Sequence, residues 1–171
     1  MKITLRKAEL CDSKHISNIY YHAIQVMNDM GINQWDNIYP NEEILYEDIK
    51  KQHMFLGETD SQIASIVVLN NEYDKEYEAA AWKYKDLSFS VVHRLCVNPV
   101  FQGKGVGQQT MLLVEEMLLS EGIETIRLDA FSLNPIAVKM YKKLGYLKVG
   151  EVIWRKGLFY LFEKKLINGE Q

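Results

Sequence analysis

The sequence contains few of the residues that cross-link a chain or divide it into parts. Only two of its 171 residues are cysteines, Cys11 and Cys96, and neither lies in a CxxC motif or at zinc-ligand spacing. This argues against a disulfide framework and a zinc module and favours a reducing compartment. The three prolines are scattered, and no linker, repeat or low-complexity tract is present. We therefore expect a single domain over residues 1–171.

Long apolar runs and an excess of positive charge are also missing. No uninterrupted apolar stretch approaches the length of a transmembrane helix, and the N-terminus lacks the apolar core of a signal peptide. The 20 Lys and Arg are balanced by 23 Asp and Glu, a formal net charge of −3. Binding to nucleic acid normally uses a basic excess. We therefore expect a cytoplasmic protein that binds neither nucleic acid nor a membrane.

The composition is that of an ordinary globular domain. Hydrophobic residues make up 47% of the chain and charged residues 25%, as is usual for a folded domain. A domain of this length buries roughly 70% of the surface that its unfolded chain exposes. It can therefore hold a core and a ligand cleft without a structural metal or a disulfide.

The hydrophobic pattern alternates between strand and helix. In the second half of the chain the order strand, helix, strand, helix implies parallel pairing within a mixed sheet. The fold class is therefore α/β with mixed topology. The expected strands are 2–7, 54–57, 62–70, 87–97, 126–130, 148–154 and 158–166, and the expected helices begin at Asp12 or Ser13, at Asn41, after the turn at 103–107 and at Ser132 or Asn134.

Residues 71–86 form a polar and partly acidic segment, with Glu72, Asp74, Glu76 and Glu78 close together. Such a run is usually a solvated loop. The functional interpretation is a mouth whose negative charge attracts a cationic substrate. The sequence leaves both interpretations open.

The glycine-rich segment Gln102-Gly103-Lys104-Gly105-Val106-Gly107 directly follows an expected strand and opens an expected helix. Backbone amides at a helix start lack intrahelical acceptors and lie at the positive end of the macrodipole, so they can bind a pyrophosphate. Glycine lets the ligand approach the backbone closely. Lys104 adds a charge-assisted phosphate contact or is merely solvated. The alternative for the glycines is a tight turn without a ligand.

Two known phosphate-binding motifs fit this segment poorly. A Walker A loop needs GxxxxGK[ST], but here the lysine lies between glycines and no Lys-Ser/Thr pair follows. A dinucleotide fingerprint lies in the first strand–helix unit, with an acidic residue about 20 positions later. This segment reads GxGxG in mid-chain, and Asp129 is only a partial match.

Three blocks of the sequence resemble one family. Gln102-x-x-Gly105-x-Gly107 resembles the [Gln/Arg]-x-x-Gly-x-[Gly/Ala] acyl-CoA motif of the GNAT superfamily of N-acetyltransferases. The segment 93–99, His-Arg-Leu-Cys-Val-Asn-Pro, is similar to the family's fourth strand, and Asn134-Pro135-x-Ala137-x-x-x-Tyr141-x-x-x-Gly145-Tyr146 is similar to its second conserved block. The blocks occur in order with matching spacing, and the resemblance covers most of the chain.

The resemblance implies both a fold and an activity. The implied fold has a mixed, mostly antiparallel central sheet, a parallel splayed pair formed by its fourth and fifth strands, and about four flanking helices. The implied activity is transfer of an acetyl group from acetyl-CoA, as cosubstrate and without a metal, to a primary amine by direct attack in a ternary complex. The alternative is a non-catalytic acyl-CoA-binding or interaction module.

The resemblance also implies how acetyl-CoA is bound. Amides of the segment 102–107 would bind the pyrophosphate, and backbone groups near Leu95 and Val97 would pair with the pantetheine arm. One N–H there would polarise the thioester carbonyl. Asn134 would contact the pantetheine or would only cap its helix. The expected cofactor-binding residues are Leu95, Cys96, Val97, Gln102, Gly103, Lys104, Gly105, Val106, Gly107, Asn134 and Tyr141.

The catalytic groups are expected around Tyr141, which matches the family's general acid and would protonate the leaving thiolate; the alternative is a core tyrosine. An alkyl amine is roughly 0.04% neutral at pH 7, so its proton must be removed before attack. His93 is the first candidate for the base and Glu72 the second. Cys96 has no paired base in the local sequence, so an acyl-cysteine intermediate is not expected.

The acceptor site is expected to include Gln34, Trp35, Tyr39 and Asp129. The two aromatics could clamp an amine by cation–π contact or could anchor their loop to the core. The acceptor is predicted only as a class: a small primary amine, an amino acid derivative, a peptide N-terminus or a lysine. The oligomeric state is open, a homodimer included.

Overall fold

The computed structural model of the chain describes residues 2–167. They form two compact units: unit 1 holds the residues up to Leu69 together with Arg94–Met111, and unit 2 holds Asn70–His93 and the residues from Leu112 onward. The prediction of a single domain over residues 1–171 stays a prediction. The helices are α1 (Ser13–Asp29), α2 (Glu42–Lys50), α3 (Val106–Ser120) and α4 (Pro135–Lys143), and the strands are β1 (Thr4–Lys7), β2 (Met54–Thr59), β3 (Gln62–Asn70), β4 (Phe89–Val97), β5 (Thr125–Phe131), β6 (Leu147–Trp154) and β7 (Gly157–Lys165).

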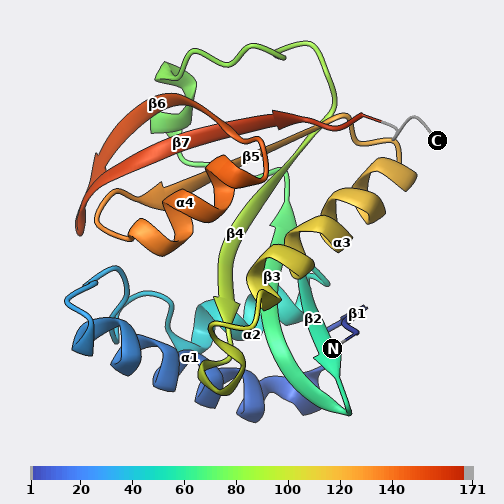
Figure 1. The fold of residues 1–171 in the computed structure, drawn as a ribbon, viewed down its shortest axis with the longest axis vertical. Helices are drawn as coiled ribbons and strands as arrows, with labels where there is room; N and C mark the ends of the chain where they lie inside the picture. The colour runs from blue at the N-terminus through green and yellow to red at the C-terminus, as the bar shows by residue number, and fades with distance from the viewer. Residues whose placement is uncertain (1, 168–171) are drawn as a thin grey trace. The chain divides into compact units, whose positions relative to one another are not determined.

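The strands confirm the expected α/β class with a mixed sheet. Their hydrogen-bonding order is β1-β2-β3-β4-β5-β7-β6, and the paths of β5, β6 and β7 within unit 2 can be followed in Figure 1. β4 and β5 are parallel, from Phe89 opposite Thr125 to Val92 opposite Leu128. The pairs β1–β2, β2–β3, β5–β7 and β6–β7 are antiparallel. Every expected strand and helix is present, with boundaries within two residues of the prediction.

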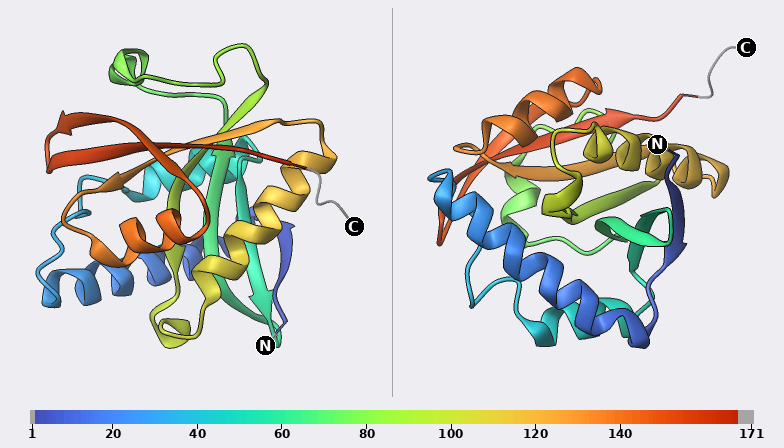
Figure 2. Two further views of the ribbon diagram at one scale, coloured as in Figure 1. Left: turned by 45° about the horizontal axis from the view of Figure 1, so that its top comes forward. Right: turned by 60° about the horizontal axis from the view of Figure 1, so that its bottom comes forward.

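The core of unit 1 forms where α1 and α2 pack against β2 and β3. The buried positions on α1, Ile16, Tyr20 and Ala23, follow the helical period, and those on α2 are Leu45 and Ile49. α1 and α2 contact each other, and both helices can be followed in Figure 2. The remaining members of this buried cluster are Ala8, Trp35, Met54, Leu56, Ile66, Val68 and Cys96.

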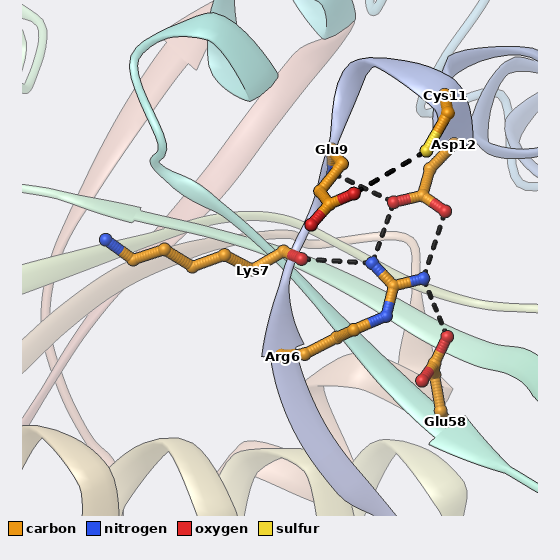
Figure 3. A network of polar contacts seen from close by, with 6 residues as sticks. All are labelled: Arg6, Lys7, Glu9, Cys11, Asp12 and Glu58. Carbon is orange, nitrogen blue, oxygen red and sulfur yellow. Dashed lines mark hydrogen bonds and ion pairs between the residues drawn. The ribbon is translucent and has the colours of Figure 1, made fainter.

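A network of charges ties the start of α1 to the sheet of unit 1 (Figure 3). Arg6 on β1 donates to both carboxylate oxygens of Asp12, at 2.7 and 3.0 Å, and to Glu58 Oε1 on β2 at 2.7 Å. Asp12 precedes α1, but its side chain makes no capping bond there and instead accepts from the Glu9 amide at 2.8 Å. Asp12 thus stands at the N-cap position of α1 without a side-chain capping bond, because Arg6 and the preceding 3₁₀ turn engage its oxygens.

Unit 2 holds residues 71–86 against β5 and β7 through a cluster of rings. Tyr77 and Trp82 are buried, and the Arg127 guanidinium lies 4.6 Å from the Trp82 ring centroid and 4.1 Å from that of Phe89. Glu163 accepts the Lys83 amide at 2.8 Å. The segment is therefore anchored rather than freely solvated, although the side chains of Glu72, Asp74, Glu76 and Glu78 are exposed.

Across residues 2–167, none of the helices is long and apolar enough to cross a membrane.

Candidate active site

The turn between β4 and α3 is fixed to β3 by one asparagine. The backbone N–H of Asn98 donates to Ala64 O at 2.9 Å, and the side-chain nitrogen of Asn98 donates to Ile63 O at 2.8 Å. The Asn98 side-chain oxygen accepts the Val100 amide at 3.3 Å and so starts the short 3₁₀ helix Pro99–Phe101. Unit 1 therefore delivers the chain to the glycine-rich segment in a defined direction.

The glycine-rich segment has the backbone that its sequence predicts. Gly103 and Gly105 have φ of 74° and 75°, in the left-handed region that glycine adopts without a steric penalty. A Cβ at Gly103 would meet no atom within 4 Å, so the space beside it is open. α3 begins at Val106, and the amides of its first turn have no acceptor within the helix. This arrangement suits an anion bound by backbone N–H groups.

The two polar side chains of this segment bind the turn itself. Lys104 Nζ donates to Val100 O at 3.0 Å and lies 5.4 Å from the Phe101 ring centroid. Gln102 Nε2 donates to Val97 O at 3.4 Å. Both side chains therefore stabilise the turn itself.

The end of β4 leaves regular strand geometry at Arg94, whose φ is 50°. Leu95 and Val97 are half-buried, whereas Cys96 lies in the core of unit 1. Burial raises the pKa of the Cys96 thiol to about 12, so this cysteine is not a ready nucleophile.

Arg94 is the centre of a polar cluster that the sequence did not indicate. Its guanidinium donates to both oxygens of Asp48, at 2.9 and 2.7 Å, and to Tyr39 Oη at 2.8 Å. Its carbonyl accepts the Tyr20 hydroxyl at 2.6 Å. Burial raises the pKa of Asp48 against the opposing charge of Arg94. These partners lie 46 to 74 positions from Arg94 along the sequence, so a local sequence pattern does not indicate them.

The expected acceptor residues of unit 1 differ in exposure. Trp35 is buried in the core, with its ring centroid 5.5 Å from that of Tyr20, which is the anchoring role. Gln34 is half-buried, and Tyr39 is exposed with its hydroxyl bonded to Arg94. Asp36 shapes the segment by accepting the amides of Ile38 and Tyr39.

In unit 2, Tyr141 is buried and packs edge-on to Tyr146, with ring centroids 5.6 Å apart. Burial, together with the negative charge of Asp129, raises the pKa of the Tyr141 hydroxyl, which therefore stays protonated at neutral pH. Asp129 accepts the Tyr77 hydroxyl at 2.7 Å. The Asn134 side chain accepts the Ala137 amide at 3.1 Å, so it caps α4.

The two candidate bases meet at one asparagine of unit 2. Asn70 Oδ1 accepts the Glu72 amide at 3.0 Å and lies 2.8 Å from His93 Nε2. One side-chain oxygen therefore brings the backbone of Glu72 and the ring of His93 together. Asn70 was not among the predicted residues.

Residues 2–167 contain no group of three or more His, Cys, Asp or Glu side chains placed to hold a metal ion.

The family model for the acetyltransferase (GNAT) family matches residues 20–146, which include the glycine-rich turn, β4 and Tyr141. The match spans well over half of the chain. The chain belongs to the GNAT acetyltransferase family. The resemblance that the three sequence blocks indicated is thus confirmed, and so is the enzyme class, an N-acetyltransferase.

Individual relatives agree with this family. The uncharacterised N-acetyltransferase YesJ of Bacillus subtilis is 25% identical over 158 residues, which cover 91% of this chain and 86% of that protein. A GNAT-family acetyltransferase from Streptococcus agalactiae superposes with a TM-score of 0.85 at 20% identity, covering 98% of this chain and 96% of that one. The acetyltransferase yncA of Salmonella typhimurium, solved with acetyl-CoA, superposes with a TM-score of 0.69 at 14% identity, covering 99% and 96%.

Proposed function

We propose that this GNAT enzyme transfers the acetyl group of acetyl-CoA to a primary amine by direct attack in a ternary complex. The amine nitrogen forms a bond to the thioester carbonyl carbon, and the carbon–sulfur bond then breaks. A base takes one proton from the amine, and an acid returns one to the leaving thiolate. The products are an N-acetylated amine and free CoA.

The turn at 102–107 carries this proposal. Its two glycines in the left-handed region and the open first turn of α3 make a backbone site for an anion such as the CoA pyrophosphate. The acetyl-CoA in the structure of yncA supports the same cosubstrate for this chain. In this proposal the backbone near Leu95 and Val97 pairs with the pantetheine arm, and Asn134 contacts it while capping α4.

Tyr141 is proposed as the general acid. Its raised pKa keeps the phenol protonated at neutral pH, and the thiolate it would protonate has an ordinary pKa near 8.5. The transfer from Tyr141 to a thiolate is uphill in water, so it depends on a water-poor site that disfavours the free thiolate. A Tyr141→Phe variant is expected to bind acetyl-CoA normally and to lose about 100-fold in kcat.

His93 is proposed as the base, with its ring positioned by the contact of Nε2 with Asn70. Glu72, which the same asparagine holds through its amide, is the second candidate. We expect His93→Ala to lower kcat and to alter the acid limb of the pH–rate profile, and Glu72→Ala to leave both near wild type. The reverse result assigns the proton transfer to Glu72.

The acceptor is proposed only as a class, a primary amine of a small molecule, amino acid derivative, peptide N-terminus or lysine, with Gln34, Tyr39 and Asp129 as contact residues. Trp35 would act by shaping the segment, since it is buried. The cytoplasmic location and a homodimer stay predictions, which cell fractionation and sedimentation would test.

The experiment that tests the proposal measures thiol release from acetyl-CoA over a broad panel of amines, with wild type and Tyr141→Phe side by side. Amine-dependent release by wild type, reduced in Tyr141→Phe, is the expected result. If the protein binds acetyl-CoA but no amine of the panel causes thiol release, it is instead a non-catalytic acyl-CoA-binding module.

A further inference from the structure

The peptide group that joins Arg94 to Leu95 has a fixed orientation. In a trans peptide the carbonyl and the following N–H point in opposite directions, because the unit is planar. Holding the Arg94 carbonyl therefore also aims the Leu95 N–H. The carbonyl is held by Tyr20, whose hydroxyl donates to it at 2.6 Å from α1.

The Tyr20 hydroxyl is a buried hydrogen-bond donor that stays protonated. Only 1% of its surface is exposed, and its ring packs against Trp35 within the core of unit 1. Burial raises the pKa of the Tyr20 hydroxyl well above its ordinary value, so the hydroxyl keeps its proton over the working pH range. A phenylalanine would fill the same space in the core without this bond.

The backbone at Arg94 needs support because it is strained. A φ of 50° lies in the left-handed region, which a residue with a side chain adopts only at an energetic cost. The bidentate contact with Asp48 and the bond to Tyr39 hold the side chain, while Tyr20 holds the carbonyl. Three contacts from three segments of unit 1 therefore stabilise one peptide orientation.

The direction of the neighbouring amides follows from β3. The Asn98 amide donates to Ala64 on β3. Because successive amides of a strand alternate between its two edges, those of Val97 and Leu95 face away from β3. The Leu95 N–H is thus turned out of the ladder with β3, and a hydrogen bond to the carbonyl of the same peptide strengthens it as a donor.

We propose that Tyr20 is a positioning residue of the reaction: it orients and polarises the Arg94–Leu95 peptide so that the Leu95 N–H can stabilise the developing oxyanion of the thioester. This inference rests on the proposed acetyl transfer. Tyr20 itself touches no reacting atom, and Arg94 and Asp48 serve the same peptide by supporting its backbone.

The test uses acetyl-CoA labelled with ¹³C at the thioester carbonyl and needs no knowledge of the acceptor. Isotope-edited infrared difference spectra give the carbonyl band of the bound ligand, which a strong hydrogen bond moves to lower frequency. We expect a downward shift on binding to wild type and a clearly smaller one in Tyr20→Phe. Calorimetric titration is expected to give the same affinity for CoA, within about twofold, in both proteins.

The matched control is Ile16→Val, which removes one methylene from a fully buried residue one turn earlier on α1. It loosens the same core without touching Arg94, so it should lower the unfolding midpoint and leave the carbonyl band at the wild-type position. An unchanged band in Tyr20→Phe, or the same change in Ile16→Val, would overturn the role of Tyr20. Failure of wild type to bind acetyl-CoA would instead overturn the proposed function.

A second pair of variants tests the peptide independently of the α1 core. Arg94→Gly and Arg94→Ala both remove the contacts with Asp48 and Tyr39, but only glycine adopts a positive φ without a penalty. We expect Arg94→Gly to retain more of the downward shift of the carbonyl band than Arg94→Ala, since Tyr20 still holds the carbonyl. Equal bands in the two variants would contradict the proposed dependence on peptide orientation.

Discussion

The turn at 98–107 and the segment 33–40 are both irregular parts of unit 1, but they are built differently. In the turn, two glycines and a helix start present backbone groups, and the side chains of Gln102 and Lys104 bind the turn itself. In the segment 33–40, Trp35 is packed into the core and Tyr39 is held by Arg94. A backbone site can be read from local spacing, whereas a side-chain site depends on partners that are distant in the sequence.

The largest effect is expected in the segment 33–40, where Trp35→Ala should lower the free energy of unfolding by about 3–5 kcal/mol. The buried ring packs on Tyr20, and its loss leaves a cavity. Chemical denaturation would measure the change, with the exposed Tyr39→Ala as the comparison and a smaller loss expected there. Equal losses would show that Trp35 is not the anchor of the segment.

In the turn, Gly105→Val should weaken acetyl-CoA binding by about 10- to 100-fold, because a β-branched residue strains the left-handed backbone next to the anion site. Gly31→Val is the matched control, since Gly31 also has φ of 75° and open space for a Cβ. Both variants should lose similar stability. Equal affinity losses measured by calorimetry would mean that the effect is general strain rather than a ligand site.

A smaller effect on stability is expected where the Asp12 side chain anchors the start of α1. Asp12→Asn should cost about 1 kcal/mol of stability at pH 7, because Asp12 loses its charge-assisted bonds to Arg6. Hydrogen bonds from Arg6 lower the pKa of Asp12 in the folded protein. The stabilisation is therefore complete above the ordinary value of about 3.9 and is lost as the pH falls through the lowered pKa.

Denaturation curves at several pH values would check this, with Asp60→Asn in the hairpin turn as the control. Asp60 has a positive φ, which asparagine tolerates, so that variant should keep the wild-type stability at pH 7. A difference between Asp12→Asn and wild type that persists undiminished in acid would contradict the ion pair as its source.

The smallest effect is expected from Lys104→Ala, which should change the acetyl-CoA dissociation constant by less than about threefold. Its ammonium binds Val100 O at the surface of the turn, and in the proposed function the backbone alone binds the anion. A tenfold loss of affinity would show that Lys104 leaves Val100 to contact a phosphate, and the turn would then be partly a side-chain site.

The sequence predicted most of the fold because its signals are local. Asn41 and Asn134 cap α2 and α4 as expected, and Gly31 and Gly122 end their helices with positive φ. At 102–107, where a motif defines the backbone, the sequence predicted the glycine-rich turn and the helix start, and the binding role of this turn stays a prediction. The structure was not predicted where distant side chains meet: Tyr20 has the spacing of an ordinary core residue on α1, and nothing near Arg94 points to Asp48 or Tyr39.

The packing of the acidic segment 71–86 was also not predicted from the sequence. Its charges suggested a solvated loop or a mouth, yet Tyr77 and Trp82 are buried, and Glu163 on β7 holds its backbone. Aromatic residues spaced irregularly in a polar run give no periodic signal. Their packing depends on partners from β5 and β7, which are distant in the sequence.

The most direct test of the proposed acetyl transfer follows the acetyl group itself. Wild-type protein is incubated with ¹³C-acetyl-CoA and each amine of the panel, and mass spectrometry and a thiol assay measure the labelled amide and the free CoA in the same sample. Direct acetyl transfer predicts labelled amide and free CoA in equal amounts with at least one primary amine. Free CoA without labelled amide, or no amine-dependent release from a protein that binds acetyl-CoA, would contradict it.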